Sequence, residues 1–382
     1  MKAGWQVKTL GSLCDVLDSQ RKPITKCDRV TGEYPYYGAT GVLSYVDGYL
    51  FDEKLVLVGE DGAKWASGEN TAFAIEGKCW VNNHAHVLRP HRSEITDNWL
   101  IHFLVHSDLS EFVSGLTVPK LNQGSLREIP IPFPPLPEQQ RIVGILDDAF
   151  DGIATANANA EQNLQNARAL FESHLQSVFA EACEVSELVT LADLATDITD
   201  GDHMPPPKAV SGVPFITIGN VDKDTRTIDF ADTFKVSREY FDRLKPNKKP
   251  QKGDVLYTVT GSFGIPVLLK EHREFCFQRH IGLVRPKPEV DSEWLYYLLL
   301  SPQIFKQAND GATGTAQKTV SLKLLRSYQV PRIPLALQRV IVAKLSAVNE
   351  ETQRLESLYQ RKLAVLDELK KSLLHQAFSG ML

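Results

Sequence analysis

Two small groups of residues have the types and spacing that metal binding or hydrolysis would require. His84 and His86 stand at alternate positions and could offer two imidazole ligands, but no neighbouring cysteine or acid completes a zinc site. Glu60 and Asp61 place two carboxylates side by side, as in a nuclease, yet no Glu-x-Lys follows them directly. We therefore expect the two histidines to form local hydrogen bonds. We predict no metal, no cofactor and no intrinsic catalysis.

The motifs of enzymes that bind nucleotides or methyl donors are missing from the sequence. An amine methyltransferase of nucleic acids needs Asn or Asp before two prolines and an aromatic residue after them, and Phe133-Pro134-Pro135-Leu136 has neither. No glycine-rich cofactor loop follows a strand, and no G-x-x-x-x-G-K-[ST] phosphate loop occurs. The chain is therefore expected to be neither a methyltransferase nor an ATP-driven motor.

The composition is that of a soluble globular protein with more than one domain. The chain has 382 residues, of which 43% are hydrophobic and 23% charged, and domains usually hold roughly 100–200 residues. No apolar run approaches the roughly 18 residues of a membrane helix, and no secretion signal is recognisable. Five cysteines without a C-x-x-C pair favour a reducing cytoplasm. The net charge of −5 argues against a protein that coats nucleic acid through bulk positive charge.

The sequence contains one module written twice. Pro135–Val143 reappears loosely as Pro334–Val342, and Phe179 matches Phe378 at the same offset of 199. Upstream, His84–Pro90 resembles His280–Pro286 at an offset of 196. Two diverged copies of one fold are therefore predicted.

Each copy begins with a globular part, residues 1–134 in the first copy and 186–333 in the second. Short runs of β-forming residues alternate there with glycine-containing turns. Helical stretches are predicted after the tryptophans, over Trp99–Leu109 and Trp294–Phe305. Both parts are expected to be mixed α/β domains with irregular β-sheet, so that the whole chain is α+β. Strands are predicted at Leu55–Val58, Cys79–Val81, Ala85–Leu88, Phe215–Ile218, Val255–Thr260 and His280–Val284.

Each copy ends in a long helix, over residues 135–185 and 334–382. Apolar or small residues recur there at steps of three and four, which is typical of a helical stripe. The first segment carries net charge −6 and the second +2, and opposite signs favour mutual packing. We predict an antiparallel coiled coil; the alternative is two independent amphipathic helices. The stripes are Leu146, Ala149, Ile153, Ala156, Ala160, Leu164, Ala167, Phe171, Leu175 and Val178, and Ile341, Leu345, Val348, Thr352, Leu355, Tyr359, Leu363, Leu366, Leu369 and Leu373.

A globular part, a P-L-x-E-Q-x-R-I-V helix entry, a long helix and then all of these again resemble the specificity subunit of a type I restriction–modification system. The second entry departs from the pattern, with Leu337 and Val340 where Glu and Arg are expected. The resemblance implies that each globular part is a target recognition domain for one half of a split, asymmetric site in double-stranded DNA. It implies that the helices set the spacing and dock methyltransferase subunits, two of them, and it allows an ATP-dependent restriction or translocation subunit as a further partner. The residues at the helix entries that match this docking role are Glu138, Gln139, Arg141, Gln338 and Arg339.

The same resemblance assigns the polar loops to DNA, since amide and guanidinium groups suit base edges and lysines suit phosphates. Two alternatives remain open: the loop at Tyr37 is a turn with core tyrosines, and the lysines near Lys245 are a solvated loop. A two-headed protein-binding scaffold on a coiled-coil spacer is the competing function. The predicted DNA-binding residues are Tyr37, Thr40, Lys64, Trp65, Asn82, Asn83, His84, Lys120, Asn122 and Gln123 in the first domain, and Lys245, Lys248, Lys249, Thr260, Ser262, Gln278, Arg279, His280, Gln317 and Lys318 in the second.

Overall fold

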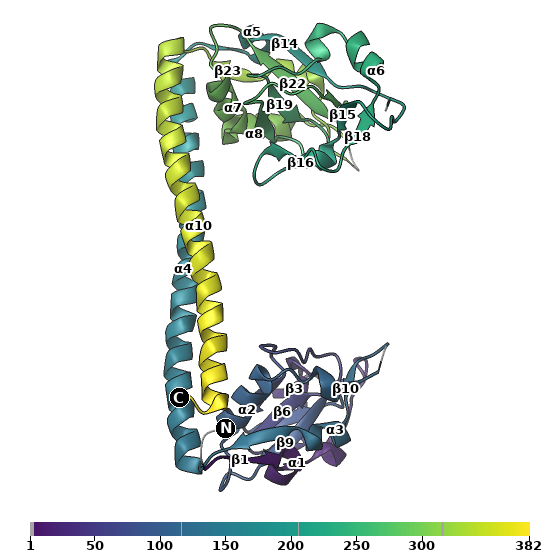
Figure 1. The fold of residues 1–382 in the computed structure, drawn as a ribbon, viewed down its shortest axis with the longest axis vertical. Helices are drawn as coiled ribbons and strands as arrows, with labels where there is room; N and C mark the ends of the chain where they lie inside the picture. Colours follow the sequence, from purple (N-terminus) through teal and green to yellow (C-terminus); the bar gives the residue numbers. More distant parts are fainter. Residues whose placement is uncertain (1–3, 116, 205, 315–316) are drawn as a thin grey trace. The chain divides into compact units, whose positions relative to one another are not determined.

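The computed structural model describes residues 4–115, 117–204, 206–314 and 317–382. The chain forms two compact units, Met1–Glu161 with Gln360–Leu382, and Gln162–Tyr359. Each unit contains one globular domain and parts of two long helices, α4 and α10 (Figure 1). We call the two globular parts the first and the second domain. No helix in the described part of the chain is long and apolar enough to span a membrane.

The first domain is built on two four-stranded sheets. One has the order β2-β9-β6-β7 and the other β4-β3-β8-β5, in which β3 and β8 run parallel. Two smaller pairs, β1 with β12 and β10 with β11, are antiparallel. The strands are β1 (Gln6–Thr9), β2 (Cys14–Val16), β3 (Tyr34–Gly38), β4 (Gly41–Val46), β5 (Phe51–Asp52), β6 (Leu55–Gly59), β7 (Ala72–Ile75), β8 (Lys78–Val81), β9 (Ala85–Pro90), β10 (Val113–Ser114), β11 (Lys120–Leu121) and β12 (Pro130–Phe133), and the helices are α1 (Leu10–Leu13), α2 (Asp97–His106) and α3 (Gln123–Glu128).

The second domain repeats this topology. Its main sheet has the order β14-β22-β19-β20, a smaller sheet β18-β15-β21 again contains a parallel pair, and β13 pairs with β23 as β1 does with β12. The hairpin β16–β17 is extra. The strands are β13 (Leu188–Thr190), β14 (Ala195–Asp200), β15 (Val213–Ile216), β16 (Val221–Asp222), β17 (Thr227–Ile228), β18 (Phe234–Val236), β19 (Val255–Thr258), β20 (Pro266–Leu268), β21 (Cys276–Phe277), β22 (Ile281–Pro286) and β23 (Gln329–Pro331), and the helices are α5 (Leu191–Leu194), α6 (Arg238–Arg243), α7 (Ser292–Leu300), α8 (Pro302–Gly311) and α9 (Leu322–Arg326).

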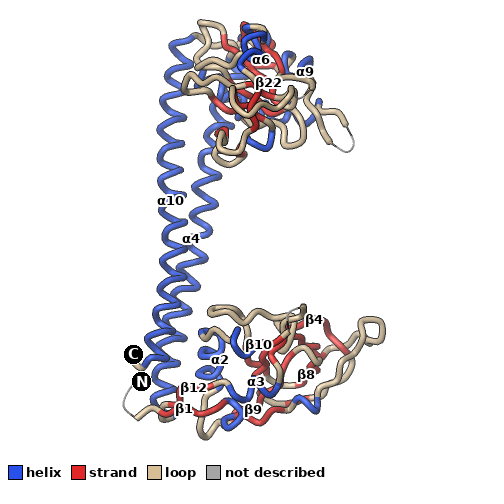
Figure 2. Tube along the Cα trace, turned by 45° about the vertical axis from the view of Figure 1, so that its right-hand side comes forward, coloured by secondary structure: helices blue, strands red, loops and turns tan. Residues whose placement is uncertain are grey.

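The structure confirms the predicted fold class of two mixed α/β domains with irregular sheets and an internal repeat (Figure 2). The helix expected over Trp294–Phe305 is, however, two helices, α7 and α8, that meet at Ser301. Pro302 disfavours helical geometry in the residue before it, and it lacks the N–H that would continue the hydrogen-bond ladder. It therefore ends α7 and occupies the first turn of α8.

The central strands of both domains are buried on both faces. Every residue of β6 is buried, and alternate side chains enter different clusters: Val56 lies in the core near α2, and Leu57 in a second core under the other sheet. In β19, Tyr257 and Leu256 divide in the same way. Continuous apolar runs follow from this arrangement, because successive side chains of a strand point to opposite faces.

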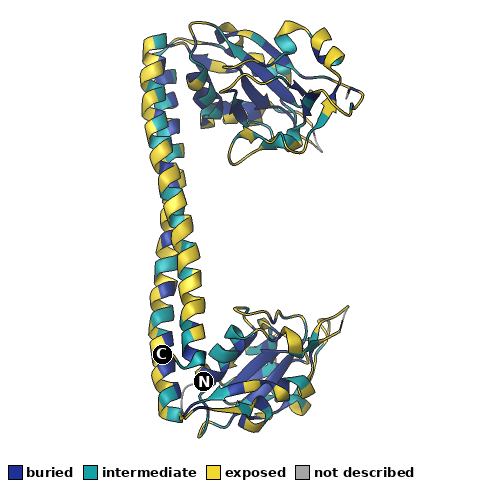
Figure 3. Cartoon of the chain, viewed as in Figure 1, coloured by how far each residue is buried: buried dark blue, intermediate teal, exposed yellow. Residues whose placement is uncertain are grey.

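The long helices α4 (Leu136–Val185) and α10 (Leu335–Ser379) lie side by side and antiparallel in each unit (Figures 1 and 2). Arg168 of α4 donates to Glu356 of α10 at 3.1 Å in the second unit. All ten predicted stripe positions of α4 are buried or partly buried, and the outward faces are exposed (Figure 3). In α10 the predicted stripe fails at Leu369, which is 45% exposed, because the buried face passes to Leu374 in the next turn.

The ends of these helices complete the two domain cores crosswise. In the first unit, Phe378 from the second copy packs on Trp99 with ring centroids 4.9 Å apart. In the second unit, Phe179 from the first copy packs on Trp294 at 6.2 Å. Both tryptophans are fully buried. The repeated phenylalanine in the sequence therefore marks the same structural position in both units.

Candidate nucleic-acid interface

Three loops of the first domain meet where β6 ends. The backbone N–H of Glu60 donates to the carbonyl of His84 at 2.8 Å, which joins the end of β6 to the loop before β9. The N–H of Leu121 donates to the carbonyl of Glu60, also at 2.8 Å, and Asp61 forms a β-bridge with Lys120. These backbone bonds place the predicted residues His84 and Lys120 beside each other.

The turn between β3 and β4 lies against the same loops. The N–H of Asn82 donates to the carbonyl of Tyr37 at 3.1 Å. A Cβ at Gly59 would clash with Ala63 and lie 3.3 Å from the carbonyl of Ala39, so only glycine permits this close approach.

The second domain joins its loops through the same bonds. Val259 donates to the carbonyl of His280 at 2.9 Å, and Val320 donates to the carbonyl of Val259 at 2.8 Å. Thr260 bridges Thr319 as Asp61 bridges Lys120. The structure therefore brings together the predicted loops at Thr260, Gln278–His280 and Gln317–Lys318.

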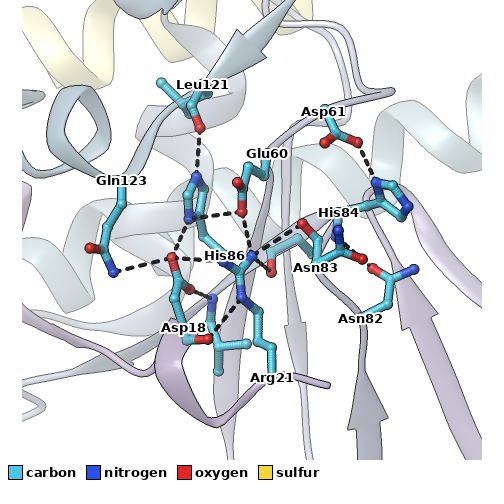
Figure 4. A network of polar contacts seen from close by, with 12 residues as sticks. Asp18, Arg21, Glu60, Asp61, Asn82, Asn83, His84, His86, Leu121 and Gln123 are labelled. Atoms are coloured by element: carbon cyan, nitrogen blue, oxygen red, sulfur yellow. Dashed lines mark hydrogen bonds and ion pairs between the residues drawn. The ribbon is translucent and has the colours of Figure 1, made fainter. Parts of the chain in front are cut away.

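A cluster of charged side chains lies beneath the loops of the first domain (Figure 4). Arg21 contacts Glu60 and donates to the carbonyl of Ala85 at 2.7 Å. Lys120 contacts the other oxygen of Glu60 at 2.7 Å. His86, fully buried, is hydrogen-bonded through Nδ1 to Asp18 at 2.6 Å and through Nε2 to the carbonyl of Leu121 at 2.7 Å. We call Asp18, Arg21, Glu60, His86 and Lys120 the ion cluster.

The charge pairs of the ion cluster determine the direction of its pKa shifts. Burial alone would raise the pKa of Glu60, but hydrogen bonds from Lys120 and Arg21 lower it on balance. Burial likewise opposes ionisation of Asp18, and hydrogen bonds from His86 and the Val87 N–H lower its pKa overall. Both carboxyl groups are thus held as carboxylates.

Asp18, Glu60 and His86 offer ligand atoms within 4.8 Å of one another, the spacing that a metal site would need. Arg21 and Lys120 already contact these carboxylates and balance their charge. The arrangement fits an ion-pair network better than a metal centre.

The predicted DNA-binding residues of the first domain differ in accessibility. Tyr37 is partly buried against Phe73. Trp65 is buried and donates its indole N–H to the carbonyl of Gly59 at 3.1 Å, and Asn82 is buried and accepts from the His84 N–H at 2.8 Å. These three residues support the loops. Lys120 is partly exposed, and the exposed members are Thr40, Lys64, Asn83, His84, Asn122 and Gln123.

In the second domain, Asp202 connects two of the predicted groups. Its carbonyl accepts from the Arg279 N–H at 3.1 Å, and its side chain accepts from Tyr240 and lies 3.9 Å from Lys248. Lys249 lies over the ring of Phe241 at 5.0 Å. Thr260 is buried, while Gln278, His280, Lys248 and Lys249 are partly exposed, and the exposed members are Lys245, Ser262, Arg279, Gln317 and Lys318.

The predicted partner residues divide into buried and exposed groups. Gln139 is fully buried: its amide donates to the carbonyls of Glu94 and Pro134 at 2.8 and 2.9 Å and accepts from the Thr96 N–H at 3.0 Å. Gln338 makes the matching bonds to Glu289, Ile333 and Asp291 in the second unit.

These amides anchor each long helix to the globular domain before it. The sequence led us to expect that they contact a partner subunit, but both side chains are buried and leave almost no surface for a partner. Glu138 and Arg141 instead form a surface ion pair at 2.7 Å, and Arg339 is exposed.

Asp18 and Arg21 were not identified from the sequence. They precede the other members of the ion cluster by about 40 residues or more, and no local spacing connects them. In the second domain Asp202 and Tyr240 were missed for the same reason. The only available signal was their charge or polarity.

The chain thus belongs to the class of proteins with duplicated sheet-and-loop domains, each completed by the ends of paired long helices. The family model of the type I restriction modification DNA specificity domain matches residues 2–166 and 183–363. The chain therefore belongs to this family and contains the domain twice, which confirms the resemblance found in the sequence.

Known relatives agree with this membership, and solved structures share the fold. A Haemophilus influenzae protein named as a type I restriction enzyme specificity subunit is 28% identical over 347 residues, covering 88% of this chain and 86% of that protein. The EcoKI specificity subunit of Escherichia coli K12 is 24% identical over 358 residues, covering 86% and 75%. The fold matches the HsdS subunit from Thermoanaerobacter tengcongensis with a TM-score of 0.61, 19% identity and coverage of 100% and 98%. A chain from a study of type I system assembly matches with a TM-score of 0.75, 19% identity and coverage of 99% and 98%.

Proposed function

We propose that this chain is the DNA-recognition subunit of a type I restriction–modification complex and that each domain contacts one half of a bipartite, asymmetric site. One observation carries the proposal: the two domains present the same three loops through the same backbone bonds but fill them with different side chains. Asn83 in the first domain corresponds to Arg279 in the second, and Lys120 corresponds to Thr319. One scaffold with two polar surfaces suits the recognition of two different sequences.

The exposed side chains divide by chemistry into two roles. Asn83 and Gln123 carry amides that suit adenine edges, and Arg279 carries a guanidinium that suits guanine. Lys64 and Lys245, both exposed, suit phosphates, which supply affinity without sequence information. Trp65 and Asn82 act indirectly by supporting the loops.

The same proposal extends to the partners and the helices. Two methyltransferase subunits dock at the two helix entries, one at the Glu138–Arg141 ion pair and the other at Arg339. Leu337 and Val340, which replace Glu and Arg in the second entry, are 46% and 50% exposed and suit an apolar contact there. An ATP-dependent restriction subunit joins through these partners. The chain itself is non-catalytic, and the helices set the gap between half-sites.

Cytoplasmic location is part of this proposal. All five cysteines are free, and three of them are buried. Burial raises the pKa of Cys14 to about 12, so its thiol stays protonated and unreactive. Free, unpaired thiols suit a reducing compartment.

A domain exchange tests the proposal. Replacing residues 1–134 by the corresponding residues of a relative, in a complex with its methyltransferase subunits, is expected to change one half of the modified sequence. The untouched second domain is the internal control. A change in both halves, or methylation without a sequence preference, would refute two independent recognition domains. Selective protein capture without any DNA preference would favour the scaffold alternative.

A point substitution tests the assignment of base contacts. Arg279→Ala is expected to relax the preference at one position of the second half-site, at a cost of roughly 1–3 kcal/mol. Lys245→Ala is the matched control, with an equal loss on every sequence. Equal losses on cognate and random DNA for Arg279→Ala would remove this residue from the base-contacting set.

A further inference from the structure

The fully buried ring of His86 is surrounded by hydrogen-bond acceptors. Its Nδ1 faces the carboxylate of Asp18 at 2.6 Å and lies 3.7 Å from Glu60, and its Nε2 faces the carbonyl of Leu121 at 2.7 Å. A carbonyl oxygen and an ionised carboxylate can only accept. Both ring nitrogens must therefore carry hydrogen, so this arrangement requires the imidazolium form.

The alternative location for the proton, on Asp18, is disfavoured by the donors around that side chain. Besides His86, it accepts from the Val87 N–H at 3.0 Å and from the Gln123 amide at 3.3 Å, and it lies 3.3 Å from Arg21. The lowered pKa of Asp18 agrees with a carboxylate at this position.

The ring connects the β-sheet to a loop of the proposed DNA surface. His86 belongs to β9, whereas Leu121 ends β11 and is followed directly by Asn122 and Gln123. Removal of one proton would leave a nitrogen lone pair against either Leu121 or Asp18, in a site closed to water. One of these two contacts would then have to break.

The second domain has no such group at the equivalent position. His86 pairs with Val58 across its sheet, and the residue that pairs with Tyr257 in the same place is Gly282. A Cβ at Gly282 would already lie 3.2 Å from the side chain of Leu325, so any side chain there would require Leu325 to shift. Val259 and Thr319 occupy the positions of Glu60 and Lys120.

We propose that His86, held by Asp18, Arg21, Glu60 and Lys120, is a positioning residue for the Leu121–Gln123 loop. DNA recognition by the first domain then weakens when His86 loses its proton. DNA recognition by the second domain does not change. The inference rests on the proposed function for its consequence in DNA recognition. Its structural part, a protonation-dependent loop, concerns the free chain alone.

Hydrogen exchange of the full chain tests the structural part without DNA. As the pH rises from about 5 to about 8, the range in which histidine side chains change their charge, the amides of residues 120–123 should open more readily. The acceleration beyond chemical exchange should be at most tenfold per pH unit, because one proton is involved. The amides of residues 319–322 serve as the internal control and should show no such extra dependence.

The variant His86→Gln carries one donor at every pH and should abolish the extra pH dependence at residues 120–123. Equal pH dependence in both domains, or none in either, would overturn the proposal. The comparison of the two wild-type segments stands without the variant, so a poorly folded H86Q protein does not weaken the test.

A second experiment measures the consequence for recognition. The full chain in complex with its methyltransferase subunits is offered a duplex library with two randomised half-sites at several pH values. Discrimination should fall with rising pH at the half-site of the first domain only. Loss at both half-sites would contradict the inference, whereas the absence of any bipartite preference at every pH would refute the proposed function, and the exchange measurement would still decide the role of His86.

Discussion

The crosswise completion of the two cores predicts an inverted pattern of destabilisation. Phe378 belongs to the second copy but packs on Trp99 of the first domain, and Phe179 belongs to the first copy but packs on Trp294 of the second. Phe378→Ala should therefore weaken the first domain, and Phe179→Ala should weaken the second. Each change removes packing from a unit whose remaining residues come mostly from the other copy.

The expected losses in the free energy of unfolding follow from the burial of the two rings. An aromatic ring that buries about 200 Å² contributes about 5 kcal/mol at 25 cal/mol per Å², and measured losses for Phe→Ala in cores are about 3–5 kcal/mol. Phe179 is fully buried and belongs at the upper end of this range. Phe378 is 9% exposed and borders a cavity of about 470 Å³, so its loss should lie near 3 kcal/mol.

Hydrogen exchange of the buried strands β6 and β19 reports on both domains in each variant. Phe378→Ala should accelerate exchange in β6 by about 100-fold, and Phe179→Ala should accelerate it in β19 by roughly 4000-fold, since 1.4 kcal/mol corresponds to a factor of ten. Leu369→Ala, at an exposed position of α10, is the control and should change neither strand. If Phe378→Ala accelerated β19 and spared β6, the assignment of the helix ends to the two cores would be wrong.

Two further predictions concern charges. Asp254→Asn should destabilise the second domain by about 3 kcal/mol, because the carboxylate is buried and accepts two hydrogen bonds from Arg285 at 2.8 and 2.9 Å. Glu53→Gln, at the more exposed Glu53–Arg89 pair of the first domain, should cost under about 1 kcal/mol. Equal losses of stability for the two variants in thermal unfolding would contradict this ranking. Replacing Lys245, Lys248 and Lys249 by Ala should weaken binding to all duplexes equally and reduce the log–log salt slope by up to about 0.9 per lost phosphate contact, and a sequence-selective loss would argue against phosphate anchoring.

Local patterns in the sequence were sufficient to predict the internal repeat, the fold class and the two long helices. The stripe of α4 was predicted at every position because helix periodicity depends on neighbours three and four residues apart. The stripe predicted for α10 fails at Leu369 for a tertiary reason, since the surface that α10 buries there is set by the fit of Leu374 and Phe378 into the first domain. The break between α7 and α8 could have been predicted from Pro302, because proline restricts the backbone of the residue before it.

The accessibility and the contacts of the site residues could be learned only from the tertiary structure. The sequence identified the polar loops by composition, but it did not separate exposed Asn83 from buried Asn82, nor did it show that Gln139 fastens its helix to its own domain. The ion cluster joins Asp18 to His86 across 68 residues and to Gln123 across 105. Such contacts depend on strand order and register, which are decided by the packing of the whole domain, so no local spacing in the chain encodes them.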